Sequence, residues 1–175
     1  SMSIRRNWNT ITNEKNIKEI TKQNNIKTVK TASNTIDVND FKTLYNALTN
    51  NTYDTLTLNI KSNIILEDDT ELNSAIKTLT INGNGKTING NNNYQFLNIT
   101  SGTSITITNI NIENCNAIDG GAIYNRGYLT ITNSTLNNNN ADEYGGAINT
   151  RSKSNIINTT FNNNTATKGG AIYSD

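Results

Sequence analysis

Apolar residues alternate with polar ones along several short stretches of the chain, and turns rich in Asn and Gly separate these stretches. Leu129 and Ile131 are two residues apart, which is the spacing of a β-strand. Leu136 lies an odd number of residues after Ile131, so both can point inward only if the chain bends near Asn133. A second bend is expected between Leu136 and Gly145, where Asn, Asp and Gly cluster, and another strand follows.

This pattern repeats along the chain. Residues 129–139 match residues 154–164 at an offset of 25, and they match residues 105–115 at an offset of 24. A fainter copy, residues 79–83, lies 26 residues further upstream. Three short strands in each period of about 25 residues predict the coil of an all-β parallel solenoid. The tetrapeptide Gly-Gly-Ala-Ile recurs in each coil, and we interpret its glycines as permission for a tight, closely packed turn.

One segment near the N-terminus follows a helical period instead. Phe41, Leu44, Tyr45 and Leu48 are spaced i, i+3, i+4 and i+7, and Asn39 is a suitable N-cap. We expect this short α-helix to cover the first coil, which the sequence places near Thr55.

The two ends of the chain differ in character. Residues 1–35 have no strong period and carry a net charge of +5, so we expect a basic polar lead-in before a capped β-helix over residues 36–175. Asp175 follows directly on a strand-like segment without a cap. We therefore expect the β-helix to be truncated here, with further coils in the natural protein, and the open end to favour end-to-end self-association.

Composition limits the classes of function. Only 33% of the residues are hydrophobic and about a fifth are Asn, which with the regular Ile and Leu spacing indicates a thin core with many polar turns. The net charge of +1 predicts no nucleic-acid partner, and the absence of a long apolar run predicts no membrane insertion. We expect no cofactor, metal or catalytic residue: there is no His, and the acidic run 67–71 lacks the spacing of a calcium loop.

Stacking the coils places like residues in columns. Asn109, Asn133 and Asn158 form one column, which we expect to be buried in the bend with amides bonded to one another. Asn139 and Asn164 form a second column. Cys115 occupies the equivalent slot in the preceding coil, so we interpret it as a small buried substitute and not as a reactive thiol.

Glycosylation sequons occur in both kinds of position. Because Asn133 and Asn158 are expected inside the bend, only Asn50, Asn98 and Asn163 are predicted as acceptors if the protein is exported.

The variable positions around Gly-Gly-Ala-Ile are the predicted binding surface. Ile123, Ile148 and Ile172 form an inward column, so their neighbours should point outward. The candidate residues are these neighbours and the residue before each glycine pair: Tyr124, Asn149, Tyr173, Asp119, Tyr144 and Lys168. Asp119 and Glu143, with Arg126 nearby, leave open an alternative in which this patch cleaves a polysaccharide.

Residues 161–164 and 169–172, Phe-Asn-Asn-Asn and Gly-Gly-Ala-Ile, resemble the paired motifs of two families. These are the chlamydial polymorphic membrane proteins and, still more, the adhesin-like surface proteins of methanogenic archaea. Residues 36–90 resemble the lead-in of the archaeal proteins. Leu136 and Ile112 stand where the motif has Phe, and Cys115 stands where it has Asn, so two of the three copies depart from it.

The resemblance implies a right-handed parallel β-helix that is exported and displayed on the cell envelope. It implies a non-enzymatic adhesin that attaches to a glycan or protein on another cell. A pectate-lyase-like, polysaccharide-active enzyme and a purely structural spacer remain alternatives, because the fold alone does not decide the function.

Overall fold

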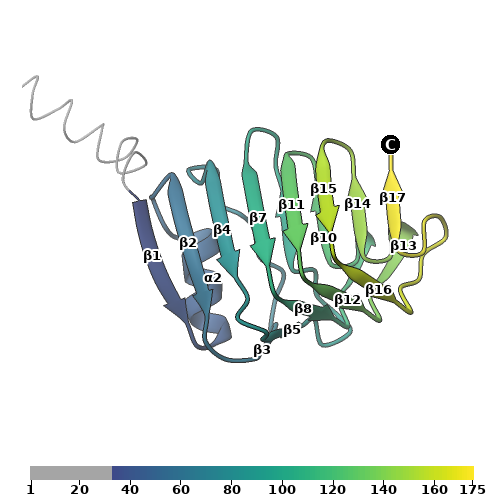
Figure 1. The fold of residues 1–175 in the computed structure, drawn as a ribbon, viewed down its shortest axis with the longest axis horizontal. Coiled ribbons are helices and arrows are strands. Elements are labelled where there is room, and N and C mark those ends of the chain that lie inside the picture. Colours follow the sequence, from purple (N-terminus) through teal and green to yellow (C-terminus); the bar gives the residue numbers. More distant parts are fainter. Residues whose placement is uncertain (1–32) are drawn as a thin grey trace, which may run out of the picture.

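Parallel sheets wrap around one elongated core in the computed structural model, which describes residues 33–175 (Figure 1). The lead-in predicted for residues 1–35 lies outside the described residues except for its last three. The chain winds through about six coils, and the Cα partners of neighbouring coils are offset by 22 to 26 residues. The class predicted from the sequence, an all-β parallel solenoid with one short helix, is confirmed.

Each side of the coil is formed by a separate sheet. The six-stranded sheet contains β1 (Ser33–Val38), β2 (Thr55–Ile60), β4 (Thr78–Asn82), β7 (Ser104–Thr108), β11 (Tyr128–Thr132) and β15 (Ser154–Ile157). The five-stranded sheet contains β3 (Ile64–Ile65), β5 (Thr87–Asn89), β8 (Asn111–Glu113), β12 (Thr135–Asn137) and β16 (Thr160–Asn162). The four-stranded sheet contains β6 (Leu97–Ile99), β10 (Ile123–Asn125), β14 (Ile148–Thr150) and β17 (Ile172–Ser174). Between the last two lies a two-stranded sheet of β9 (Asn116–Asp119) and β13 (Asn140–Tyr144).

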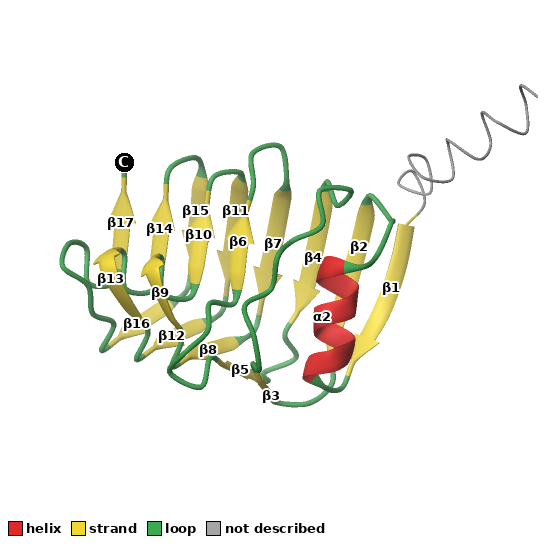
Figure 2. Cartoon of the chain, turned by 180° about the vertical axis from the view of Figure 1, so that it is seen from behind, coloured by secondary structure: helices red, strands yellow, loops and turns green. Residues whose placement is uncertain are grey.

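The coils wind in one direction. In Figure 1 the chain descends through the six-stranded sheet at the front, crosses the five-stranded sheet below and returns upward behind. Figure 2, seen from the opposite side, has the four-stranded sheet and the helix in front. Since the chain also advances from left to right in Figure 1, the winding is right-handed, as expected.

The core is built from apolar columns that run through the coils. Leu79, Ile105 and Leu129 are in register with one another and at most 1% exposed, and Ile156 is paired with Ile131 at the predicted offset of 25. Burying such side chains supplies about 1.5–3 kcal/mol each, so the alternation of Ile or Leu with Thr drives the stacking.

The helix α2 (Phe41–Thr49) begins one residue later than expected. Asp40 and not Asn39 is the N-cap, because Oδ1 of Asp40 accepts a hydrogen bond of 2.8 Å from the backbone N–H of Thr43. This bond lowers the pKa of Asp40. Leu44 and Leu48 are buried.

The solenoid also begins earlier than expected. The strand β1 precedes the helix and pairs with β2 from Ser33 onward, so the first strand is not the one at Thr55. Along the chain, the helix connects β1 to β2, which pair directly with each other. In space it lies on the side of the coil that the four-stranded sheet occupies in later coils (Figure 2).

Each of the later coils turns at three residues that have a positive φ. Two columns of corners are asparagines, Asn109, Asn133 and Asn158 and then Asn114, Asn138 and Asn163, with φ between 47° and 56°. The third column is Gly120, Gly145 and Gly169, with φ between 62° and 71°. Asn is the side chain that best tolerates this left-handed conformation, which explains the Asn-rich composition.

Glycine is required at the third corner for a second reason. A Cβ atom at Gly145 would overlap the backbone carbonyl of Ile148, so no side chain fits there. A Cβ at the next residue, Gly146, would overlap the carbonyl of Gly170 in the following coil. The interpretation of the glycine pair as a tight turn with close packing is consistent with these contacts.

The buried asparagine ladder is the Asn139 column. The backbone N–H of Cys115 donates to Oδ1 of Asn139, and the backbone N–H of Asn139 donates to Oδ1 of Asn164, both at 2.9 Å. The amide groups of Asn139 and Asn164 also donate to the carbonyls of Ile112 and Leu136. Each ladder amide therefore satisfies two backbone groups of the preceding coil.

The other predicted ladder is not buried, which is a correction. Asn109, Asn133 and Asn158 are exposed, although Nδ2 of Asn158 donates to Oδ1 of Asn133 at 2.6 Å. A residue in the left-handed conformation at this corner directs its side chain outward, so the column occupies the outer edge of the bend.

The last coil leaves apolar side chains less covered than the coils before it. Phe161 and Ile172 are partly buried, whereas the preceding Leu136 and Ile148 are 0% exposed, and Ile157 is 56% exposed. Further coils and end-to-end self-association stay predictions.

Removing one ladder amide should destabilise the fold. We expect Asn139→Ala to lower the free energy of unfolding by about 1–3 kcal/mol, because the buried N–H of Cys115 loses its acceptor. Urea denaturation measures the change. The exposed Asn140→Ala serves as the control and should lose much less; equal losses would contradict the role of the ladder.

The glycine corner can be tested in the same way. Gly85 also has a positive φ, +73°, but nothing lies within 4 Å of a Cβ built there. Gly85→Ala should therefore cost only the backbone penalty of about 1–2 kcal/mol. Gly145→Ala should cost clearly more, since its Cβ meets backbone atoms, and equal unfolding midpoints of the two variants would refute the steric argument.

Candidate functional site

A hollow of about 480 Å³ lies where the two-stranded sheet meets the four-stranded sheet. Its walls combine carboxylates, amides, one tyrosine and one exposed isoleucine. The lining residues are Asp69, Asn93, Gln95, Asn98, Asn116, Ala117, Ile118, Asp119, Tyr124 and Asp142.

The hollow exists because one coil takes a shorter path. Asn89 pairs with Glu113 and Leu97 pairs with Ile123 in the next coil. Leu97 thus follows Asn89 by eight positions along the chain, whereas its partner Ile123 follows Glu113 by ten. The shorter coil has no strand that pairs with β9, because the two-stranded sheet contains only β9 and β13. Its residues Asn93 and Gln95 therefore line a space beside β9 that a further strand would fill.

Gln95 anchors this shorter wall. Its side-chain amide donates to the carbonyls of Asp119 and Gly120 at 3.0 and 2.7 Å, and its backbone N–H donates to Oδ1 of Asp69 at 2.8 Å. Three successive coils are therefore connected at one side of the hollow. Sites held by rigid elements keep their geometry when a ligand binds.

The carboxylates of the hollow form no salt bridge within the described residues. Oδ1 of Asp119 is buried and has no hydrogen-bond partner among the described residues. The carboxylate of Asp142 accepts no hydrogen bond within residues 33–175. The salt bridge found in that part of the chain joins Arg151 to Asp175, is about half exposed and involves none of these carboxylates.

Tyr124 closes the hollow on the side of the four-stranded sheet. The guanidinium of Arg126 lies 5.1 Å from the centre of its ring, a cation–π contact. Arg126 also donates to Oδ1 of Asn98 at 3.0 Å. Arg126 is thus held against Tyr124 and Asn98, outside the lining of this hollow. The side chain of Arg151 also hydrogen-bonds Tyr124.

The predicted surface residues separate into groups. Asp119 and Tyr124 both line the hollow. Tyr144 and Tyr173 pack against each other outside it, with ring centroids 4.7 Å apart. Lys168 is exposed, and its backbone pairs with that of Tyr144 in a single β-bridge.

Asn149 corrects the expectation of an exposed position. It has the outward parity, but it lies between Tyr124 and Tyr173 in register and is only 2% exposed. Its Oδ1 has no partner among the described residues. Neighbouring coils cover an outward side chain when they present larger ones, so parity alone does not predict exposure.

Among the lining residues that sequence reasoning did not predict are Asp69, Gln95, Asn98 and Asp142. Asp69 belongs to the acidic run 67–71, which was considered only as a calcium loop. The first three precede the clear repeats, where Gly-Gly-Ala-Ile is absent and columns cannot be read. Asp142 is an exposed residue of the repeat, and the sequence analysis named its neighbour Glu143 as the candidate carboxylate instead.

Two further hollows continue from the first towards the helix. A hollow of about 460 Å³ shares Asp69, Gln95 and Asn98 with it and also includes Arg126. A third, of about 450 Å³, shares Tyr45 and other residues with the second. The three hollows follow the axis of the solenoid across several coils.

The sequons are more accessible than expected. Asn50 and Asn163 are exposed as predicted, and Asn98 is half-buried and bonded to Arg126. Asn133 and Asn158 are exposed as well, so burial does not exclude them as acceptors.

Residues 33–175 contain neither a cluster of metal-binding side chains nor a helix that could span a membrane. No group of three or more His, Cys, Asp or Glu side chains in this range is arranged to hold a metal ion. None of the helices described here is long and apolar enough to cross a bilayer.

The fold and the repeated corners define the class: the chain is a parallel β-solenoid repeat protein. Residues 158–175 match the Chlamydia polymorphic membrane protein repeat. In the structure, this match extends from an exposed Asn corner through Phe161 and the ladder residue Asn164 to the glycine corner and β17. The chain is therefore a β-solenoid with a repeat of this type. No curated protein and no solved structure matches the chain significantly.

Cys115 should be unreactive in the folded protein. It is 1% exposed, and burial raises the pKa of its thiol to about 12. Since only the thiolate reacts, iodoacetamide at pH 9 should label the native protein far more slowly than the protein in urea. Mass spectrometry of this single cysteine measures the rates, and rapid labelling of the native protein would contradict the buried assignment.

Proposed function

We propose that the protein is a non-enzymatic cell-surface attachment module that binds a glycan chain along the row of hollows. The hollow between Asp119 and Tyr124 is the observation that carries this proposal. Its lining offers hydrogen-bond donors and acceptors for hydroxyl groups and apolar contact from Tyr124 and Ile118, a combination suited to sugars.

Two further observations support attachment at a surface. The matched repeat is described as one of a Chlamydia polymorphic membrane protein, which favours an outer-surface location for this chain. The solenoid holds its outward residues in fixed register, so several weak contacts along one ligand add up to useful affinity. Adhesion of this kind needs neither a cofactor nor a metal.

A polysaccharide-cleaving enzyme is the second candidate, because Asp119 and Asp142 line the same hollow and carboxylate pairs cleave glycosidic bonds. The two functions differ in one outcome: an enzyme releases shorter products, whereas an attachment module retains its ligand unchanged.

Binding to an array of immobilised glycans, combined with a product-release assay on every bound glycan, tests the proposal. We expect Tyr124→Ala to weaken binding about tenfold, or ~1.4 kcal/mol, because it removes one wall of the hollow. No bound glycan should be shortened.

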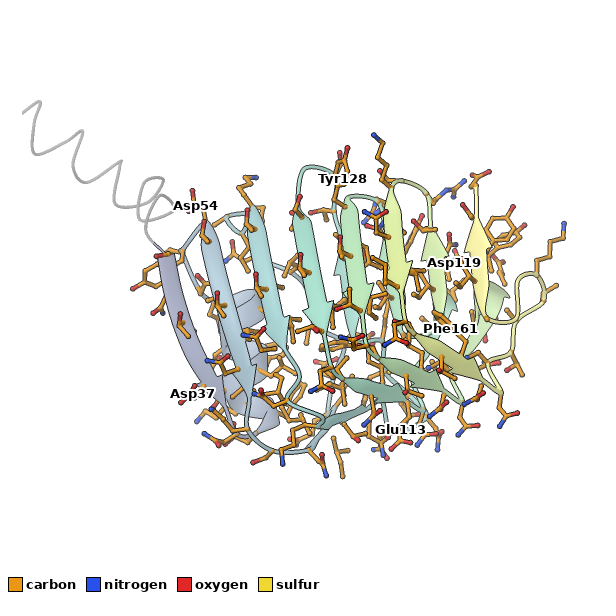
Figure 3. All side chains as sticks on the ribbon, viewed as in Figure 1. Asp37, Asp54, Glu113, Asp119, Tyr128 and Phe161 are labelled. Carbon is orange, nitrogen blue, oxygen red and sulfur yellow. The ribbon has the colours of Figure 1, made fainter. Side chains whose placement is uncertain are left out.

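Tyr128→Ala is the matched control. Tyr128 is 51% exposed, and the ammonium group of Lys153 lies 5.7 Å from the centre of its ring. It differs from Tyr124 in position, because it is the first residue of β11 in the six-stranded sheet (Figure 3). Its loss should leave glycan binding unchanged. Equal effects of the two substitutions, or no binding to any glycan, would refute the proposal, and product release would favour the enzyme.

A further inference from the structure

The charge of the hollow indicates what kind of sugar it selects. Asp69, Asp119 and Asp142 contribute three carboxylates to its walls, and no Lys or Arg lines it. An anionic glycan such as a polyuronide would meet repulsion from all three. A cationic group would meet attraction, because none of the three carboxylates forms a salt bridge within the described residues.

The carboxylates are available to a ligand to different degrees. Asp69 accepts one hydrogen bond, from the backbone N–H of Gln95, and remains a charged acceptor. Asp119 has a buried carboxylate oxygen without a donor, and burying such a group without a partner is unfavourable. Asp142 is exposed at the rim. A ligand that carries several positive charges and hydrogen-bond donors along its length would compensate them.

The rest of the lining favours a sugar over a basic peptide. Four amide side chains, Asn93, Gln95, Asn98 and Asn116, face the hollow together with the carboxylates. Many of these amide groups already hold bonds within the protein, but their remaining positions, together with the carboxylates, offer several partners to the hydroxyl groups of a sugar ring. A lysine side chain presents one polar group on an apolar stem. The hollow of about 480 Å³ is also wide enough to hold a ring.

From this combination we infer that the hollow binds a glycan of protonated amino sugars, with ammonium groups of successive sugars beside Asp69, Asp119 and Asp142. These three carboxylates lie on different coils and span about 14 Å along the axis. The inference rests on the proposed function of the same site and adds the charge of the ligand to it.

Isothermal titration calorimetry of the full chain with three hexamers tests the inference. The probes are the hexamer of glucosamine, which carries amino groups, the hexamer of N-acetylglucosamine, which is neutral, and the hexamer of galacturonic acid, which is anionic. We expect the glucosamine hexamer to bind at least about fivefold more tightly than the neutral one at low ionic strength. The preference should shrink as salt is added, and the anionic hexamer should not bind.

Substitution of the carboxylates identifies the site. Asp69→Asn, Asp119→Asn and Asp142→Asn should each weaken binding of the glucosamine hexamer about twofold to fivefold more than they weaken binding of the neutral hexamer. Asn keeps the shape of Asp, and unchanged unfolding midpoints would show that the fold is intact. Glu113→Gln is the matched control, because Glu113 lies on the five-stranded sheet, on another side of the coil from Asp119 (Figure 3).

The outcomes separate the inference from the function on which it rests. Equal affinity for the amino and neutral hexamers would overturn the inference but leave glycan attachment intact. An equal loss in Glu113→Gln would also overturn it. Binding of a lysine hexamer in preference to every sugar would replace the amino sugar by a basic peptide. Failure to bind any glycan, in this titration and on the array, would remove both.

Discussion

The left-handed corner is the constraint on which the structure depends. Each later coil must change direction three times within about 24 residues, and it does so at single residues with positive φ. Two corners accept Asn, whose side chain points outward or to its neighbours. The third accepts only Gly, because Ile148 or its equivalent leaves no room for a Cβ. With the corners fixed, the alternating residues between them fall into columns, and the core follows.

The sequence predicted the features that repetition makes visible. The columns of Ile131, Ile148 and Asn139 could be read because a parallel solenoid places equivalent residues one above another, so the period gives the register directly. Burial was predicted less well. Asn133 and Asn139 look alike in the repeat, yet Asn133 is exposed and Asn139 is buried. Asn133 is itself a corner residue with positive φ and points outward, whereas Asn139 follows the next corner and points inward.

The candidate site could be predicted only in part for a related reason. Asp119 and Tyr124 belong to a clear repeat, and their position beside the glycine corner was apparent. The hollow itself results from the coil that departs from the repeat, in which Gln95 bridges what a strand fills elsewhere. An irregular coil has no counterpart to align with, so its residues could not be placed. Asn149 shows the same limit, because the side chains that cover it come from other coils.

The proposed attachment to a surface would subject the protein to mechanical force along the solenoid. Each coil adds only one strand to each sheet, and this determines how the solenoid responds. Neighbouring coils are held by parallel ladders and by the amides of Asn139 and Asn164, and every coil contacts mainly the next one. Tension along the axis therefore loads these contacts one coil at a time, so the rod yields by peeling from an end. Gln95 connects three coils at the hollow, and this staple resists peeling where the ligand would pull.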